Sequence, residues 1–144
     1  MAAPREARDP TARLDQAPDP PSHLGGRAAA EWRRLAPVAV ALGTLTEADL
    51  RGFELLCETL ATEAEARAVI QAEGCATTTA GGGAKSRPEV RVMETARAQA
   101  ARLLAEFGLM PKGRRGLDPP PRGDDDLDCL RSLLARPPAA GERG

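Results

Sequence analysis

Hydrophobic residues recur at helical spacing from residue 26 onward, and the first such run covers residues 26–42. Its apolar positions alternate four and three residues apart and share one helical face: Ala28, Trp32, Leu35, Ala39 and Leu42. Gly43 ends this predicted helix. Pro37 lies inside it, and because proline lacks a backbone N–H and clashes with the preceding turn, we expect the helix to kink or split there.

A longer helix is predicted from Thr46 to the residue before Gly74. The Thr46 hydroxyl can cap the first turn, and Glu47 and Asp49 place negative charge near the positive end of the helix dipole. The apolar face of this helix consists of Phe53, Leu56, Cys57, Leu60 and Ala64.

A third helix is predicted from Pro88 to Phe107, with Gly108 as its C-terminal stop. Its apolar face consists of Met93, Ala96, Ala100, Leu103 and Phe107. Two apolar faces of similar length can cover each other, so we expect the two long helices to form an antiparallel hairpin. The intervening residues 74–87 contain three consecutive threonines and three consecutive glycines, and we expect them to form a loop.

The two ends of the chain have a different composition. Residues 1–22 contain five prolines among charged and small residues, which predicts a disordered arm that is either a solvated tail or a contact for DNA or a partner. Residues 118–144 form an acidic, proline-rich tail. One helical face interrupts this tail, formed by Leu127, Leu130, Leu133 and Leu134. We expect a short amphipathic helix there, of the kind that docks on a partner.

The expected fold is therefore all-α: a kinked N-terminal helix, a long antiparallel helical hairpin over residues 23–117, disordered termini and a short C-terminal helix. The predicted core draws on alanine, with two Phe, one Trp and no Tyr in the whole chain. A small core of this kind gains stability by burying its faces against other copies, so we expect a homo-oligomer. The residues expected to pack this core and the oligomer are Trp32, Leu35, Phe53, Leu56, Leu60, Met93, Leu103 and Phe107.

The sequence offers little for catalysis. The single histidine, His23, lies in the proline-rich arm, and the three cysteines form no CxxC or Cys/His cluster, so we predict no catalytic site, metal or cofactor. The stretch 81–86 resembles a phosphate-binding loop, but Thr79 and Ala84 stand where the motif requires glycine. No apolar run approaches the roughly 20 residues that cross a bilayer, so we expect a soluble cytoplasmic protein without a membrane partner.

The order and spacing of several residues resemble those of phage terminase small subunits. These residues are Pro21, Leu24, Ala29, Trp32, Leu35, Pro37, Leu42, Gly43, Leu45, Thr46, Asp49, Cys57, Ile70, Gly74, Pro88, Phe107, Gly108, Leu109, Met110, Pro111 and Arg114. The resemblance implies a ring of subunits in the cytoplasm of the bacterial host. It also implies that the ring recognises the start of packaging on viral DNA and regulates the large subunit, which carries the ATPase and nuclease. Lys112 and Gly113 depart from the family, whose members tend to have small hydroxyl residues there.

Charge clustering selects the candidate contacts to double-stranded DNA. One cluster lies at the hairpin end and one follows the last helix: Lys85, Arg87 and Arg91, and Lys112, Arg114 and Arg115. Arg33 and Arg34 are second-rank candidates, and the formal net charge of −1 excludes a strongly basic coat protein. We expect the four tail leucines to dock on the large subunit. Two alternatives remain at this stage: a dimeric helical DNA-binding regulator, and a structural helical oligomer of the phage particle.

Overall fold

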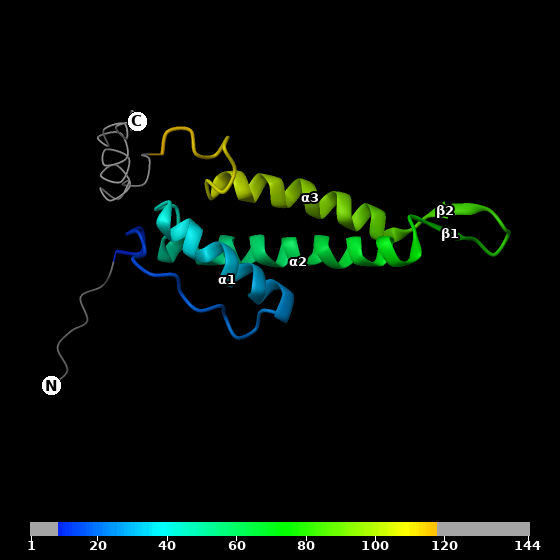
Figure 1. Cartoon of the computed structure of the whole chain (residues 1–144), viewed down its shortest axis with the longest axis horizontal. Coiled ribbons are helices and arrows are strands. Elements are labelled where there is room, and N and C mark those ends of the chain that lie inside the picture. The colour runs from blue at the N-terminus through cyan, green and yellow to red at the C-terminus, as the bar shows by residue number, and fades with distance from the viewer. Residues whose placement is uncertain (1–8, 118–144) are drawn as a thin grey trace, which may run out of the picture.

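The computed structural model describes residues 9–117, and three helices account for more than half of these residues. Their order along the sequence is α1 (Gly26–Ala41), the 3₁₀ helix η1 (Glu47–Asp49), α2 (Leu50–Glu73), β1 (Ala76–Thr78), β2 (Ala84–Ser86) and α3 (Pro88–Glu106). Helices α2 and α3 lie side by side along the long axis of the molecule, and α1 lies along the part of α2 nearest to its start (Figure 1). No helix within the described range is long and apolar enough to cross a membrane.

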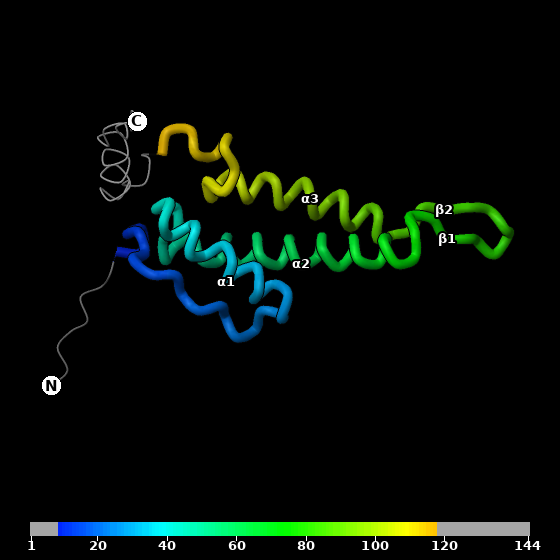
Figure 2. The backbone as a smooth tube through the Cα atoms, viewed as in Figure 1, coloured from blue at the N-terminus to red at the C-terminus, as the bar shows by residue number. Residues whose placement is uncertain are grey.

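The all-α prediction is wrong at residues 74–87, which form a two-stranded antiparallel sheet in place of the expected loop. Thr77 pairs with Lys85 across the two strands, and Thr78 pairs with Ala84. Threonine is β-branched and favours extended backbone, while Gly82 adopts φ +81° and closes the turn. The threonines and glycines that indicated a loop therefore build a hairpin that projects beyond the ends of both long helices (Figure 2).

The helix boundaries lie close to the predicted positions. The Asp49 carboxylate accepts hydrogen bonds from the Thr46 hydroxyl at 2.6 Å and from the Thr46 backbone N–H at 3.3 Å, so Thr46 and Asp49 cap the start of η1 and α2 together. Gly108 has φ +67°, the left-handed conformation in which a helix commonly ends. Pro37 does not split α1, and a bend at this residue stays a prediction. Ser86 belongs to β2, and Arg87 occupies the N-cap position of α3.

One ladder of aromatic rings joins all three helices. Trp32 from α1 meets Phe53 from α2 edge to face at 5.0 Å between ring centroids, and Phe53 meets Phe107 at the end of α3 at 5.2 Å. These three residues and the predicted core residues Leu35 and Leu56 are buried. Among the other predicted core residues, Leu60 and Leu103 pack partly buried against this cluster, whereas Met93 is only half-buried and lies outside it.

Residues 9–24 differ from the disordered arm that was expected over residues 1–22. We call residues 9–24 the N-terminal strap. The Leu14 backbone N–H donates to the Leu45 carbonyl at 3.1 Å, and the indole N–H of Trp32 donates to the Pro18 carbonyl at 2.8 Å. Leu14 also packs partly buried against the core. Prolines lower the chain entropy lost on docking, so a proline-rich segment can lie in extended form along a helical surface when such contacts are present.

The strap is also held to α2 by a hydrogen bond. His23, which the sequence analysis assigned to the proline-rich arm, contacts the Glu54 carboxylate, which Arg51 also contacts. Glu54 is 6% exposed. The hydrogen bond with His23 lowers the pKa of the Glu54 carboxyl, burial opposes this shift, and the charge of Arg51 adds to the lowering.

Glu54→Gln is therefore expected to lower the free energy of unfolding at pH 7. A carboxyl whose folded-state pKa is depressed stabilises the fold fully above its unfolded pKa of about 4.3, and this contribution disappears as pH falls through the folded value. The difference between the wild type and Glu54→Gln should thus shrink between pH 7 and pH 3 in urea unfolding. Glu65→Gln is the matched control, because its exposed carboxylate lies 4.0 Å from Arg27. Equal pH dependence for both variants would contradict the role assigned to Glu54.

Candidate functional site

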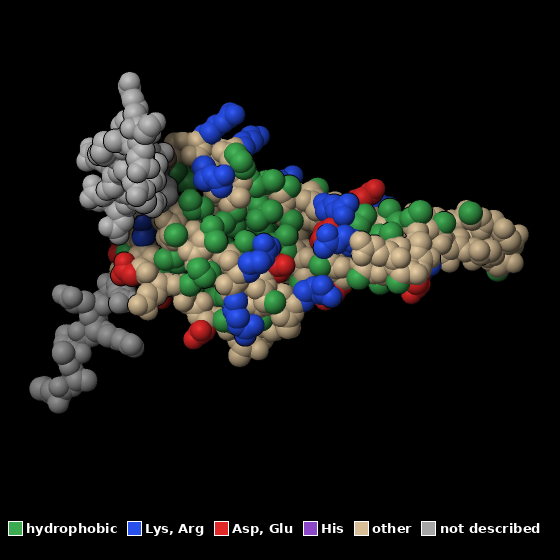
Figure 3. Space-filling model, viewed as in Figure 1, with side chains coloured by type: hydrophobic (Ala, Val, Ile, Leu, Met, Phe, Trp, Pro, Cys, Tyr) green, Lys and Arg blue, Asp and Glu red, His purple; other side chains and the backbone are tan. Residues whose placement is uncertain are grey.

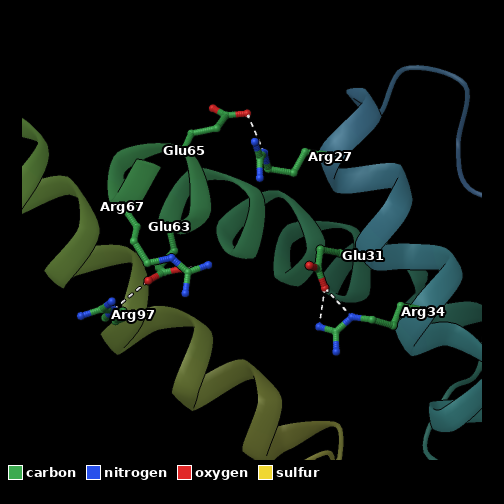
Figure 4. A network of polar contacts seen from close by, with 7 residues as sticks. All are labelled: Arg27, Glu31, Arg34, Glu63, Glu65, Arg67 and Arg97. Atoms are coloured by element: carbon green, nitrogen blue, oxygen red, sulfur yellow. Dashed lines mark hydrogen bonds and ion pairs between the residues drawn. The ribbon is translucent and has the colours of Figure 1, made fainter. Parts of the chain in front are cut away.

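Carboxylates neutralise many of the arginines on the helical body. Arg27 of α1 lies 4.0 Å from Glu65 of α2, and Arg97 of α3 donates to Glu63 of α2 at 2.8 Å. Figure 4 shows these two contacts on either side of α2. It also shows the second-rank DNA candidate Arg34 paired with Glu31 at 2.5 Å, and Arg67 3.7 Å from Glu63 in the spacing of one helical turn.

Arg87 is occupied by the base of the β-hairpin. Its guanidinium donates to the Gly74 carbonyl at 3.0 Å and to the Glu73 carbonyl at 3.3 Å, and it lies 2.8 Å from the Glu73 carboxylate. The Arg87 side chain is only 18% exposed. These bonds satisfy carbonyls at the C-terminal end of α2, where positive charge is favourable. Of the predicted DNA contacts, Arg87 therefore has the fewest donors left for a phosphate.

Other predicted contacts have no carboxylate within ion-pair distance among the described residues. Lys85 projects from β2, and Arg91 lies in the first turns of α3. Arg102 shares this property and was missed by the sequence analysis. It follows Arg91 by eleven residues, close to three helical turns, so both lie on one side of α3 about 16 Å apart. This spacing was available in the sequence but was overlooked because Arg102 stands alone among alanines and leucines.

The chain after α3 folds back and adds further cations to this side. Lys112 and Arg115 line one hollow together with Arg102, and Glu106 is its single carboxylate. We call Arg91, Arg102, Lys112 and Arg115 the cation row. On the face shown in Figure 3, Lys and Arg side chains gather around the carboxyl end of α3, with hydrophobic side chains among them.

Glycine makes this fold-back possible. A Cβ at Gly113 would lie 1.7 Å from the Ala105 carbonyl oxygen, so only glycine can approach α3 this closely. The guanidinium of Arg114 donates to the Gly108 carbonyl at 3.3 Å, which caps the end of α3 with a positive charge. Gly113 therefore has a structural role, and Arg114 differs from its neighbours in bonding the helix end.

An apolar groove of about 640 Å³ runs between α2 and α3 on the outside of the hairpin. Leu55 and Val92 line it and are 50% and 45% exposed, which is high for large aliphatic side chains. Arg91 also lines it. The groove therefore offers exposed apolar surface that another protein chain can bury.

The structure offers little for catalysis in the range 9–117. No group of three or more metal-ligating side chains occurs within this range. Burial raises the pKa of the Cys57 thiol to about 12, which keeps the thiol protonated and unreactive at neutral pH. Lys85 and Ser86 lie in a strand and not at a helix start, so residues 81–86 do not have the geometry of a phosphate-binding loop.

Among the comparisons with known proteins, one gives a match, and this match covers most of the fold. Searches of curated proteins and of solved structures found no match. The family model described as phage terminase, small subunit, matches residues 28–124, a range that begins in α1 and includes both long helices, the hairpin and the cation row. Since this match covers well over half of the sequence, the chain belongs to the phage terminase small-subunit family.

Proposed function

We propose that this chain binds double-stranded viral DNA to initiate packaging and regulates the large terminase subunit, without catalysing a reaction itself. The observation that carries the DNA-binding part is the separation of charges on the helical body. Arg27, Arg34, Arg67 and Arg97 each face a carboxylate, whereas the four residues of the cation row have none within ion-pair distance in the described range. Unpaired, exposed cations are the groups that exchange counterions for phosphates.

The proposed contacts follow the predicted clusters, with two residues given another role and one residue added. Lys85, Arg91, Lys112 and Arg115 remain DNA contacts, and Arg102 joins them. Arg87 and Arg114 hold the backbone that presents their neighbours, because both donate to carbonyls at helix ends. Contacts of this kind fix the position of a protein on DNA without selecting a base sequence.

The proposed partners also include further copies of the chain and the large subunit. Leu55 and Val92 in the groove are exposed apolar residues that an oligomer would bury, which supports a homo-oligomeric ring. The predicted docking residues Leu127, Leu130, Leu133 and Leu134 lie outside the described residues and stay a prediction. In this function the protein would act in the cytoplasm of the bacterial host during infection.

Light scattering and duplex binding on the full chain test the proposal. We expect a mass of several subunits and salt-dependent binding of a 40-base-pair duplex. Deletion of residues 123–144 should leave the number of subunits in the assembly unchanged. The same deletion should abolish pull-down of the large subunit. A monomer with no affinity for duplex DNA at low salt would overturn the proposal. A stable dimer that binds DNA and ignores the large subunit would instead favour the helical regulator.

A further inference from the structure

The β-hairpin between α2 and α3 is an appendage without a hydrophobic face. We call residues 75–87 the β-ribbon. Every side chain of β1 and β2 is exposed, and the ribbon extends past the helices (Figure 1). An isolated two-stranded hairpin is marginally stable in water, so one that packs on nothing is retained at a cost in stability.

The β-ribbon is nevertheless well ordered at its base and at its tip. At the base, the Arg87 backbone N–H donates to the Cys75 carbonyl at 2.9 Å, and the Arg87 guanidinium bonds the end of α2 as described above. At the tip, the Thr79 hydroxyl lies 3.1 Å from the Gly83 carbonyl, and the Gly83 N–H donates to the same hydroxyl at 3.2 Å. These bonds hold the ribbon in one shape while its surface stays free for a partner.

The chemistry of the β-ribbon favours a polyanionic partner. No acidic residue occurs between Glu73 and Glu89, and the largest uncharged side chain in that interval is threonine. Protein interfaces depend on aromatic and bulky apolar side chains, and the ribbon has none. One face instead presents Thr77 beside Lys85, because cross-strand partners point to the same side of a sheet. The ribbon therefore offers a positive charge, a hydroxyl and small side chains.

The dimensions select the major groove of a DNA duplex. Two strands lie about 4.8 Å apart, so a two-stranded ribbon with threonine-sized side chains is roughly 10 Å wide. The major groove is about 12 Å wide and admits such a ribbon, whereas the minor groove of an undistorted duplex, at about 6 Å, is narrower than the ribbon. Arg91 is the first residue of the cation row and lies about one helical turn after Arg87 at the ribbon base. When the ribbon lies in the groove, Arg91 is therefore placed to contact a phosphate beside the groove.

We infer that the β-ribbon enters the major groove of duplex DNA with its Thr77 and Lys85 face toward the bases. Arg87 is then a positioning residue that fixes the ribbon relative to α3. The inference rests on the proposed DNA-binding function and adds the element that enters the duplex and the groove that receives it.

Site-specific photocrosslinking from the ribbon tip tests the inference. The full chain would carry Cys75→Ser and Cys129→Ser, and Ala80→Cys at the tip would be alkylated with an azidophenacyl group; the buried thiol of Cys57 resists alkylation. We expect crosslinks to a 40-base-pair duplex. Netropsin, which fills the minor groove, should leave them unchanged. A duplex of the same sequence with glucosylated 5-hydroxymethylcytosine, whose sugar fills the major groove, should reduce them at least tenfold. Ala12→Cys on the strap is the exposed control and should not crosslink.

Three results would overturn the inference. Crosslinks from the tip to a second protein chain would show that the free strand edges pair with another copy. Crosslinks that persist on the glucosylated duplex would place the tip outside the major groove. A tip that gives no crosslinks while fluorescence anisotropy reports bound duplex would remove the ribbon from the interface and leave the proposed function standing. If the protein does not bind duplex DNA at all, both the inference and the proposed DNA-binding function are wrong. As a second measurement, Lys85→Ala should lower the affinity for the duplex about tenfold, because it removes the one positive charge on the face toward the bases, and unchanged affinity would contradict that orientation.

Discussion

Trp32→Ala is expected to remove a large share of the stability of the fold. Trp32 is 1% exposed, begins the aromatic ladder and bonds the strap through its indole N–H. Truncating a buried Trp to Ala costs about 3–5 kcal/mol, because the transfer free energy is lost and a cavity remains. The total free energy of unfolding of a domain of this size is only about 5–15 kcal/mol. Urea unfolding followed by circular dichroism at 222 nm, at one fixed chain concentration, measures the loss without relying on the fluorescence of this single Trp.

One further variant at this position separates packing from hydrogen bonding, and one at another position of α1 serves as a control. Trp32→Phe keeps an aromatic ring against Phe53 but deletes the donor to the Pro18 carbonyl, so about 1 kcal/mol should be lost through that bond, in addition to a packing defect. Proteolysis within the strap should then become faster. Val38→Ala on the same helix, at an exposed position, should change stability by less than about 0.5 kcal/mol. Similar losses for Val38→Ala and Trp32→Ala would show that the aromatic ladder is not the main stabilising contact.

Replacing the whole cation row with alanine is expected to abolish most DNA binding. The variant Arg91→Ala, Arg102→Ala, Lys112→Ala, Arg115→Ala removes four unpaired cations. Each phosphate contact contributes about 0.9 to the slope of log affinity against log salt, so the slope should fall by about 3–4 and affinity at 0.1 M salt by about 10³-fold. Fluorescence anisotropy with a 40-base-pair duplex over a salt series measures both quantities.

The chain contains a charge-matched control for this experiment. Alanine at Arg27, Arg34, Arg67 and Arg97 removes the same number of positive charges, but these four guanidiniums face carboxylates. This control should keep the salt slope within about one unit of the wild type, provided that circular dichroism shows it folded. Equal losses in both variants would mean that net charge, and not the cation row, determines binding. Gly113→Ala keeps every charge and displaces the turn carrying Lys112 and Arg115, so it should weaken binding without changing net charge.

The sequence by itself determined the helical core. Helix ends depend on residues that are neighbours in the chain, and Gly43, Gly74 and Gly108 marked them correctly. The apolar face containing Trp32 and Phe53 followed from a spacing that one helix imposes on its own side chains. Such local signals need no knowledge of what the helix packs against.

Only the tertiary structure decided which charged and polar residues are available for binding. Arg87 and Arg91 carry the same charge and belong to the same predicted cluster, so the sequence does not distinguish them. In the structure, Arg87 donates a hydrogen bond to the Gly74 carbonyl at the end of α2, whereas Arg91 is exposed. The proline-rich strap resembled a disordered arm because its contacts, such as Trp32 with Pro18, join segments distant along the chain. Hydrogen bonds and ion pairs act over a few ångströms in space. Whether a cation is neutralised therefore depends on which distant residues folding brings beside it, and no pattern within one segment contains that information.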